Sequence, residues 1–377
     1  MQRSYVPRNI YLIAILSLVM LCTGSSKAQT LPATESGKPI VPGASSAEHL
    51  PAPPASRVDV SSETMMPKTV EDWSTPSLKG SELQPVDALV GEVYKGDGSF
   101  TRELIRLQWR SADPVDLYIL KPSGVAKPSV ILYLYSYPFE LDRFRDDGFC
   151  RFLTQNGVAA IGFASALTGQ RYHSPRPLKQ WFVSNLQESL ATSAHDVQMI
   201  LNYVATRGDM DMDRVGMFGD GSGASIAILA AAVDPRIKAL DLLDPWGDWP
   251  DWIAKSTLVP DNERADLLKP EWLAGVAPLD PMKWLPELKT RKVRIRNVAT
   301  VTVTPSEAKR RIEAAAPANV KIVHYEDARA FQTAASGGTG FDWIKHSIKQ
   351  QVQDGARQPG GKLRSQDSSG MRARMER

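Results

Sequence analysis

Between residues 115 and 350 the sequence alternates short apolar runs with longer segments of helical periodicity, and this alternation restricts the fold more than any other feature. The runs at 129–135 and 158–163 are almost wholly apolar, as expected for strands that are buried on both faces. A helix is predicted from about Leu186, because apolar residues recur at spacings of four and three up to Val204. We therefore predict an α/β fold: a mostly parallel sheet of six strands after an initial antiparallel part, with helices on both faces.

Composition divides the chain into further regions. Residues 29–60 are rich in Pro, Ala and Ser, which favours an extended, disordered linker. Residues 352–377 combine Gly, Ser and Gln with an excess of basic side chains, which favours a flexible basic tail. The span 61–351 remains for one folded domain, which is long enough to bury a sizeable core.

Residues 1–28 have the features of a secretory signal peptide. Arg3 and Arg8 precede an apolar run at 10–21, which is short for a membrane-spanning helix. A small residue, Ala28, then ends the segment, so we expect cleavage after it. The expected product is secreted or periplasmic and meets the membrane only through its signal peptide.

Two other outcomes are open at this end of the chain: a retained anchor, and a lipoprotein attached through Cys22. If Cys22 leaves with the signal, Cys150 is the one remaining cysteine. A single thiol cannot form an internal disulfide, so stability must come from a packed core. We expect Cys150 to act as a small apolar residue on a helix.

The net charge of +3 gives no reason to expect a nucleic-acid partner. Residues 1–28 contain Arg3, Arg8 and Lys27 and no acidic residue, so the rest of the chain is neutral overall. No Cys pair, His-Glu-x-x-His motif or ordered acidic loop suggests a metal site, and we expect no cofactor.

The segment 214–224, Arg-Val-Gly-Met-Phe-Gly-Asp-Gly-Ser-Gly-Ala, reads as a strand, a Gly-rich turn and a helix. Ligands of open α/β sheets lie beyond the carboxyl ends of the strands, so this turn is well placed for a site. The pattern resembles the nucleophile elbow of the α/β-hydrolase superfamily, nearest to its dienelactone-hydrolase and prolyl-oligopeptidase-like branches. The resemblance spans about residues 90–350.

The resemblance implies a catalytic nucleophile, but its position is taken by Gly221, between Gly219 and Gly223. Glycine tolerates the positive φ of such a turn and has no side chain that could attack a carbonyl. The resemblance also places a histidine after the last strand, where Arg329 stands. Arginine is permanently charged and cannot act as a general base.

The acid that the resemblance implies would follow the strand in 293–303, where 298–305 contains no carboxylate. Asp244, after the preceding strand, is the substitute. We expect the histidines of the chain to be surface or core residues: His49, His173, His195, His324 and His346.

Asp220 and Ser222 are the neighbours of Gly221 along the chain. Ser222 is a weak candidate nucleophile. It lies one residue beyond the nucleophile position, and in a helix this step rotates the side-chain direction by about 100°. Asp220 is a weaker candidate. A third interpretation uses the glycines alone: Gly219-x-Gly221-x-x-Ala224, with Asp241 or Asp244 at the next strand, satisfies a relaxed dinucleotide-binding pattern. The Gly219–Gly223 turn could equally bind an anion through free N–H groups.

Aromatic residues surround the predicted turn in the fold. Trp246, Trp249 and Trp252 follow the strand at 238–243, and either line a ligand cleft or cover the core. Tyr135 and Tyr137 leave an earlier strand on one face. With Gly219, Gly221 and Ser222, the residues Tyr137, Trp246 and Trp249 form the predicted ligand-binding set.

From the sequence we therefore expect a secreted hydrolase-like protein that lacks the Ser-His-Asp triad and binds a small molecule of unknown identity without cleaving it. Two alternatives stay open: an active esterase, lactonase or peptidase that uses Ser222, and a dinucleotide- or anion-binding protein.

Overall fold

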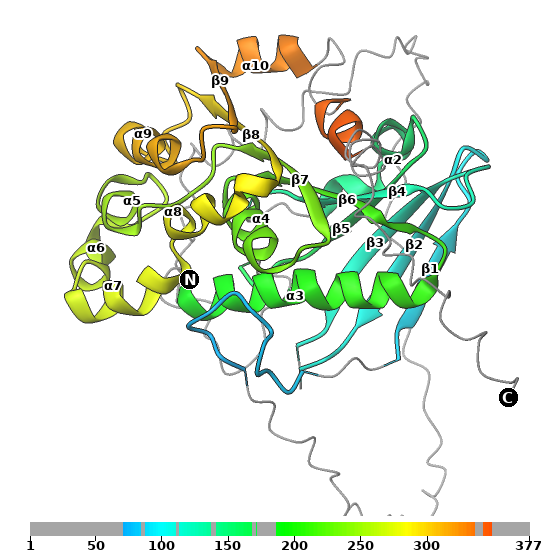
Figure 1. Cartoon of the computed structure of the whole chain (residues 1–377), viewed down its shortest axis with the longest axis horizontal. Coiled ribbons are helices and arrows are strands. Elements are labelled where there is room, and N and C mark those ends of the chain that lie inside the picture. The colour runs from blue at the N-terminus through cyan, green and yellow to red at the C-terminus, as the bar shows by residue number, and fades with distance from the viewer. Residues whose placement is uncertain are drawn as a thin grey trace, which may run out of the picture. The chain divides into compact units, whose positions relative to one another are not determined.

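The computed structural model describes residues 71–83, 87–110, 113–136, 141–167, 171, 186–335 and 342–348. The predicted signal peptide, linker and basic tail lie outside these residues, as do Tyr137, His49 and His173. Within the described part, nine strands form one sheet in the order β1-β2-β3-β5-β4-β6-β7-β8-β9 (Figure 1). The strands are β1 (Leu89–Tyr94), β2 (Phe100–Leu107), β3 (Val115–Pro122), β4 (Ser129–Leu134), β5 (Val158–Phe163), β6 (Asp211–Asp220), β7 (Ile237–Leu243), β8 (Lys292–Val298) and β9 (Lys321–Tyr325).

The strands β4 to β9 pair in parallel, whereas β1, β2 and β3 pair antiparallel with each other and β3 pairs antiparallel with β5. The predicted α/β class is confirmed, including six parallel strands after an antiparallel part. Every residue of β4 and β5 is buried, as their unbroken apolar sequences predicted.

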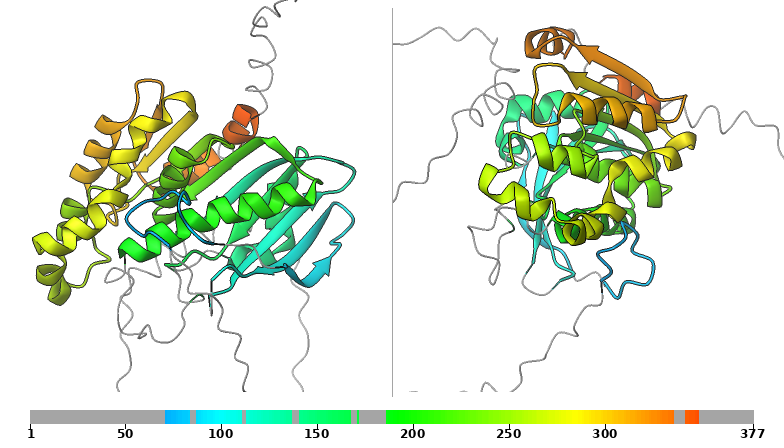
Figure 2. Two further views of the ribbon diagram at one scale, coloured as in Figure 1. Left: turned by 60° about the horizontal axis from the view of Figure 1, so that its bottom comes forward. Right: turned by 90° about the vertical axis from the view of Figure 1, so that its left-hand side faces the viewer.

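Helices cover both faces of the sheet (Figures 1 and 2). Residues of α3 and α4 share one apolar cluster with one face, and residues of α2 and of the segment 342–348 share a second cluster with the other. The α-helices are α2 (Asp147–Thr154), α3 (Leu186–Arg207), α4 (Ser222–Val233), α5 (Trp249–Lys255), α6 (Asp261–Leu267), α7 (Pro270–Val276), α8 (Pro281–Trp284), α9 (Ser306–Ala315) and α10 (Ala328–Ala334).

Two sequence expectations were incomplete. The span 244–290, interpreted as irregular, contains the short helices α5 to α8. These have four to seven residues, too few to show a helical repeat, and in α5, α7 and α8 a proline sits in the first turn. The strand expected in 293–303 ends at Val298, and α10 was not predicted.

Cys150 lies on α2 and is buried and free, as expected for a packing residue. Burial raises the pKa of its thiol. No described helix is long and apolar enough to span a bilayer.

Candidate functional site

The Gly-rich turn joins β6 to α4 at the carboxyl edge of the parallel strands. Gly221 has φ 55° and ψ −114°, a backbone conformation that residues other than glycine adopt only with strain. Its N–H donates to the carbonyl of Leu243, 2.8 Å away, and its carbonyl accepts from the N–H of Ala224 at 3.1 Å. The backbone therefore turns sharply from strand to helix between two neighbouring strands.

The flanking glycines are required by close backbone packing. A Cβ on Gly219 would lie 2.5 Å from the Cα of Ala224. A Cβ on Gly223 would lie 2.0 Å from the carbonyl oxygen of Leu134 on β4. Both distances are far inside van der Waals contact, so the two glycines let α4 approach β4 and β6 closely.

The space beside Gly221 is already filled. A Cβ on this residue would lie 2.5 Å from Ser136 Oγ and 3.0 Å from Trp246 Nε1. Ser136 follows β4, and the pairing of Leu134 with Gly219 brings residues 136 and 221 to the same level. The hydroxyl of Ser136, which is only partly buried, thus lies where a nucleophile side chain would leave the elbow.

Sequence reasoning missed Ser136, because no motif marks it. The strand register could have found it, since Ser136 comes two residues after β4 and Gly221 two residues after the paired Gly219. Ser222, the residue named instead, has 0% of its surface exposed at the start of α4. The structure therefore places a different serine, Ser136, beside Gly221.

Two carboxyl groups lie at the same edge. Burial, followed by the charge of Asp244, raises the pKa of Asp220 to about 7, against the opposing charges of Arg143 and Arg296. Asp220 is thus divided between its acid and carboxylate forms near neutral pH. Such a group can both donate and accept a proton.

Asp244 is engaged in structural bonds. Lys309 Nζ lies 2.7 Å from its Oδ1, and the N–H of Val298 donates to the same oxygen at 3.1 Å. Burial raises the pKa of Asp244 although Lys309 acts in the other direction. Asp244 also has a positive φ of 44°, and its N–H donates to the carbonyl of Arg296 on β8 at 2.8 Å.

Comparison with solved structures identifies the fold. An acetyl xylan esterase from Paenibacillus sp. R4 is similar, with a TM-score of 0.51 and 13% identity over 75% of this chain and 90% of the other. A putative dienelactone hydrolase from Klebsiella pneumoniae subsp. pneumoniae MGH 78578 has a TM-score of 0.45 and 18% identity, covering 70% and 100%. No family model and no curated protein sequence matches the chain. The chain has the α/β-hydrolase fold.

Arg329, the residue that stands where the sequence resemblance implies a histidine, lies on the helix α10 after β9, and its side chain is exposed. Asp327 caps this helix by accepting from the N–H of Ala330 at 2.7 Å. The segment therefore begins a helix where the hydrolase resemblance implies a histidine loop.

No described histidine bonds to the turn of this α/β-hydrolase fold. His195 is buried between Glu71 and the carbonyl of Thr75 on the side of α3. His324 pairs with Glu313 at 2.7 Å, and His346 contacts the carbonyl of Asp342 one helical turn back, at 2.6 Å. Each ring is already engaged away from Gly221, as expected for surface and core histidines.

The tryptophans named as ligand-binding candidates lie in the core. Trp246, Trp249 and Trp252 have at most 1% of their surface exposed. The rings of Trp246 and Trp252 are 4.9 Å apart, and Trp249 meets Trp252 edge-on at 5.8 Å. The main chain of Trp246 accepts from Ser225 Oγ at 2.7 Å, so the cluster supports the turn from inside.

Tyr135 is buried on the other face, where its ring packs against Phe218 and the guanidinium of Arg143 lies over it at 4.5 Å. Burial raises its pKa to about 12. Tyr137, its predicted partner, lies outside the described residues.

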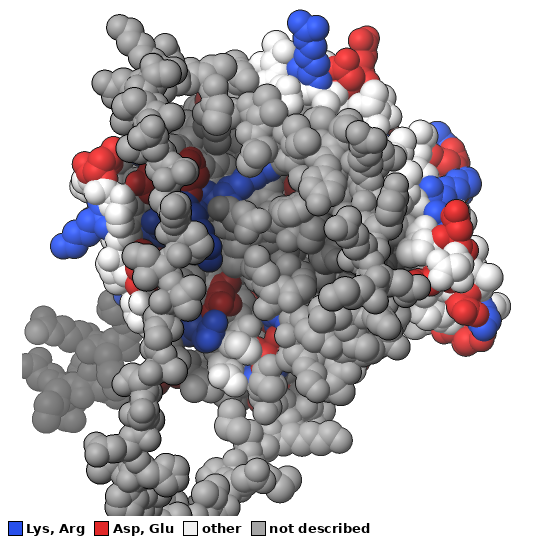
Figure 3. All heavy atoms as spheres, turned by 180° about the vertical axis from the view of Figure 1, so that it is seen from behind, with Lys and Arg blue, Asp and Glu red and all other residues white. Residues whose placement is uncertain are grey.

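The other candidate sites are accounted for by packing. Asp241, the acidic residue of the dinucleotide pattern, is buried and pairs with Arg294 at 2.6 Å and Arg296 at 2.9 Å. No cluster of His, Cys, Asp and Glu that could hold a metal occurs among the described residues. On the face shown in Figure 3, acidic and basic described side chains lie next to each other along the rims.

Proposed function

We propose that this chain is a small-molecule-binding protein on the α/β-hydrolase fold that does not carry out Ser-His-Asp hydrolysis. The observation that carries the proposal is Gly221. It has the backbone geometry of an elbow, it lacks a nucleophile, and the side chains of Ser136 and Trp246 fill the space where one would lie.

The partner positions support the same conclusion. Arg329 cannot accept a proton, and Asp244 is bound to Lys309 and the backbone of Val298. Triad members act as a unit, and the loss of one removes most of the rate enhancement, on the order of 10⁶-fold in a serine protease. A chain that lacks two of the three would turn over esters at a negligible rate.

The edge of the turn offers binding groups instead. Asp220 can donate a hydrogen bond as an acid near neutral pH, Arg143 supplies a positive charge, and Ser136 supplies a hydroxyl. Arg143 acts electrostatically on Asp220, and Ser136 lies beside Gly221, the next residue along the chain, so we propose that a small polar ligand binds at this edge without any bond being broken.

The binding proposal is tested by thermal-shift screening of small polar molecules against the purified full chain. Compounds that raise the melting temperature should lose this effect in Ser136→Leu, which replaces the hydroxyl beside Gly221 with a larger apolar side chain. Ser123→Leu, on the exposed turn before β4, is the matched control and should keep it. Compounds that stabilise both variants equally would contradict binding at the elbow.

A hydrolase with an unconventional nucleophile is the second candidate. Two observations favour it: Ser136 Oγ lies at the nucleophile's place, and the similar structures carry the names of esterases and hydrolases. In this mechanism Ser136 Oγ attacks the ester carbonyl, Asp220 takes the hydroxyl proton, and the alcohol leaves with that proton before water releases the acid.

Fluorophosphonate labelling separates the two candidates. We expect no labelling of the full chain and no turnover of short-chain esters, while an active serine esterase labels in parallel. Labelling that is lost in Ser136→Ala and kept in Ser222→Ala would overturn the binding proposal in favour of the hydrolase. The reverse pattern would assign the nucleophile to Ser222.

A further inference from the structure

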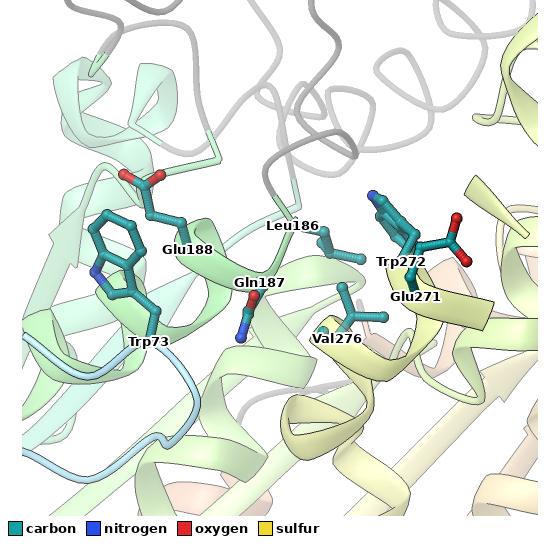
Figure 4. Close-up of a pocket in the computed structure, with 8 residues that line it drawn as sticks. Trp73, Leu186, Gln187, Glu188, Glu271, Trp272 and Val276 are labelled. Carbon is teal, nitrogen blue, oxygen red and sulfur yellow. The ribbon is translucent and has the colours of Figure 1, made fainter. Parts of the chain in front are cut away.

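A cleft opens beside the amino end of α3, between α7 and the segment 71–83 (Figure 4). Its volume is about 330 Å³, within the range of small-ligand sites. It shares no lining residue with the elbow. The lining residues are Trp73, Leu186, Gln187, Glu188, Glu271, Trp272, Gly275 and Val276.

Two indole rings border this cleft from different elements. Figure 4 shows Trp73, from the segment 71–83, on one side and Trp272, from α7, on the other. Trp73 is 42% exposed, which is unusual for the largest apolar side chain, while Leu186 and Val276 are buried at the base. The cleft therefore has an indole ring on each of two sides.

The polar groups around the cleft are acidic or neutral. Glu188 and Glu271 contribute carboxylates, and among the described lining residues there is no Lys, Arg or His. Glu271 forms no ion pair with another described residue. Gln187 contributes an amide whose oxygen lies 3.3 Å from the Cβ position of Gly275, so it is held against α7. The two carboxylates favour a cation over an anion in this cleft.

The segment that contains Trp73 is bonded to the rest of the domain on both sides of this residue. Two residues before it, Glu71 bonds to Arg110 at 2.6 Å and to His195 at 2.5 Å. Burial opposes these bonds, but together they lower the pKa of Glu71 to about 2. Two residues after it, the carbonyl of Thr75 bonds to His195 at 2.9 Å. The backbone on both sides of Trp73 is therefore held in place, which reduces the entropy lost when a ligand binds.

We propose that this cleft binds an organic cation with an alkylated ammonium group. Such a cation is attracted by indole faces and by carboxylates at once, and its methyl groups gain contact with the rings. A neutral polyol could hydrogen-bond to the same carboxylates but gains nothing from their charge.

Isothermal titration of the full chain with choline and with 3,3-dimethylbutan-1-ol, its neutral isostere, tests the proposal. Choline should bind in the millimolar range and the isostere at least about five-fold more weakly, the difference expected for one cation–aromatic contact. Trp73→Ala should weaken choline binding about five-fold, and Glu271→Gln about three-fold. Glu287→Gln, an exposed carboxylate on the turn after α8, should leave it unchanged.

Equal binding of choline and the isostere would overturn the proposal and leave an apolar groove. Binding of a neutral disaccharide in preference to choline would replace the cation by a polyol, and no binding of either would remove the site. Because Trp73→Ala could loosen its segment, Glu271→Gln on α7 provides an independent check. Ser136→Leu at the elbow should not change choline binding, so failure here is distinct from failure of the proposed function.

Discussion

The turn after β6 and the segment after β9 lie at the same edge of the sheet, yet they are built in opposite ways. In the turn, Gly219 and Gly223 approach neighbouring backbone so closely that a Cβ would lie within 2.5 Å of it. In the segment after β9, α10 has no buried residue, and Arg329 is exposed. Packing therefore dictates the backbone of the turn, whereas nothing in the packing dictates which side chain stands at residue 329. The backbone of the turn and the side chain at residue 329 are therefore constrained independently of each other.

Gly223 gives the largest expected effect in a test of this comparison between the turn after β6 and the segment after β9. Replacement by Ala should cost about 3–5 kcal/mol in the free energy of unfolding, because the new Cβ would lie 2.0 Å from the backbone oxygen of Leu134, which cannot move aside easily. Gly91→Ala is the control, since its Cβ would meet Leu104 at an ordinary 3.6 Å. Denaturant unfolding measures both. Similar stabilities for the two variants would contradict the close-packing argument.

Lys309 tests the buried bonds next to the turn. Lys309→Met should cost about 3 kcal/mol, because it leaves the carboxylate of Asp244 buried without its cation and leaves the carbonyl of Val298 without its donor. The double variant Lys309→Met, Asp244→Asn should recover part of the loss. The measurement is the free energy of unfolding of each variant at neutral pH. If the loss in the double variant equals the sum of the two single losses, the pair is not coupled.

Asp220 tests the electrostatics of the turn. Its pKa is about 7 in the folded chain and about 3.9 in the unfolded chain, so its protonated form is stabilised by folding. This stability is present below pH 4 and is lost as the pH rises through 7. The free energy of unfolding of Asp220→Asn, relative to that of the wild type, should therefore rise by about 2 kcal/mol from pH 5 to pH 8. Unfolding curves at both pH values measure the gain, and the exposed Asp213→Asn should show none.

Arg329 should give the smallest effect. Its side chain is exposed and α10 has no buried residue, so Arg329→Ala should change the free energy of unfolding by less than about 0.5 kcal/mol. The measurement is again denaturant unfolding at neutral pH. A loss above 2 kcal/mol would show that this segment is held as firmly as the turn, and the contrast between the two regions would disappear.

The sequence predicted the fold well and the site only in part. Apolar runs and helical stripes located the strands β3 to β9 and the long helices, because buried elements must carry such patterns. The short helices α5 to α8 were missed, because such helices depend on their tertiary neighbours. Ser136 was missed because its place beside Gly221 depends on the register between β4 and β6, which no local pattern encodes.

By itself, the sequence determined that residue 221 is a glycine and residue 329 an arginine, and so which reactions these positions cannot perform. It also determined the α/β class, through periodicity that reflects burial. Only the tertiary structure decided that Ser136 fills the space beside the elbow, that Trp246, Trp249 and Trp252 lie in the core, and that Trp73 and Trp272 face one cleft. The physical reason is that burial requires an apolar pattern within each segment, which can be read from the sequence of that segment alone. Proximity between distant segments arises only when the segments pack together.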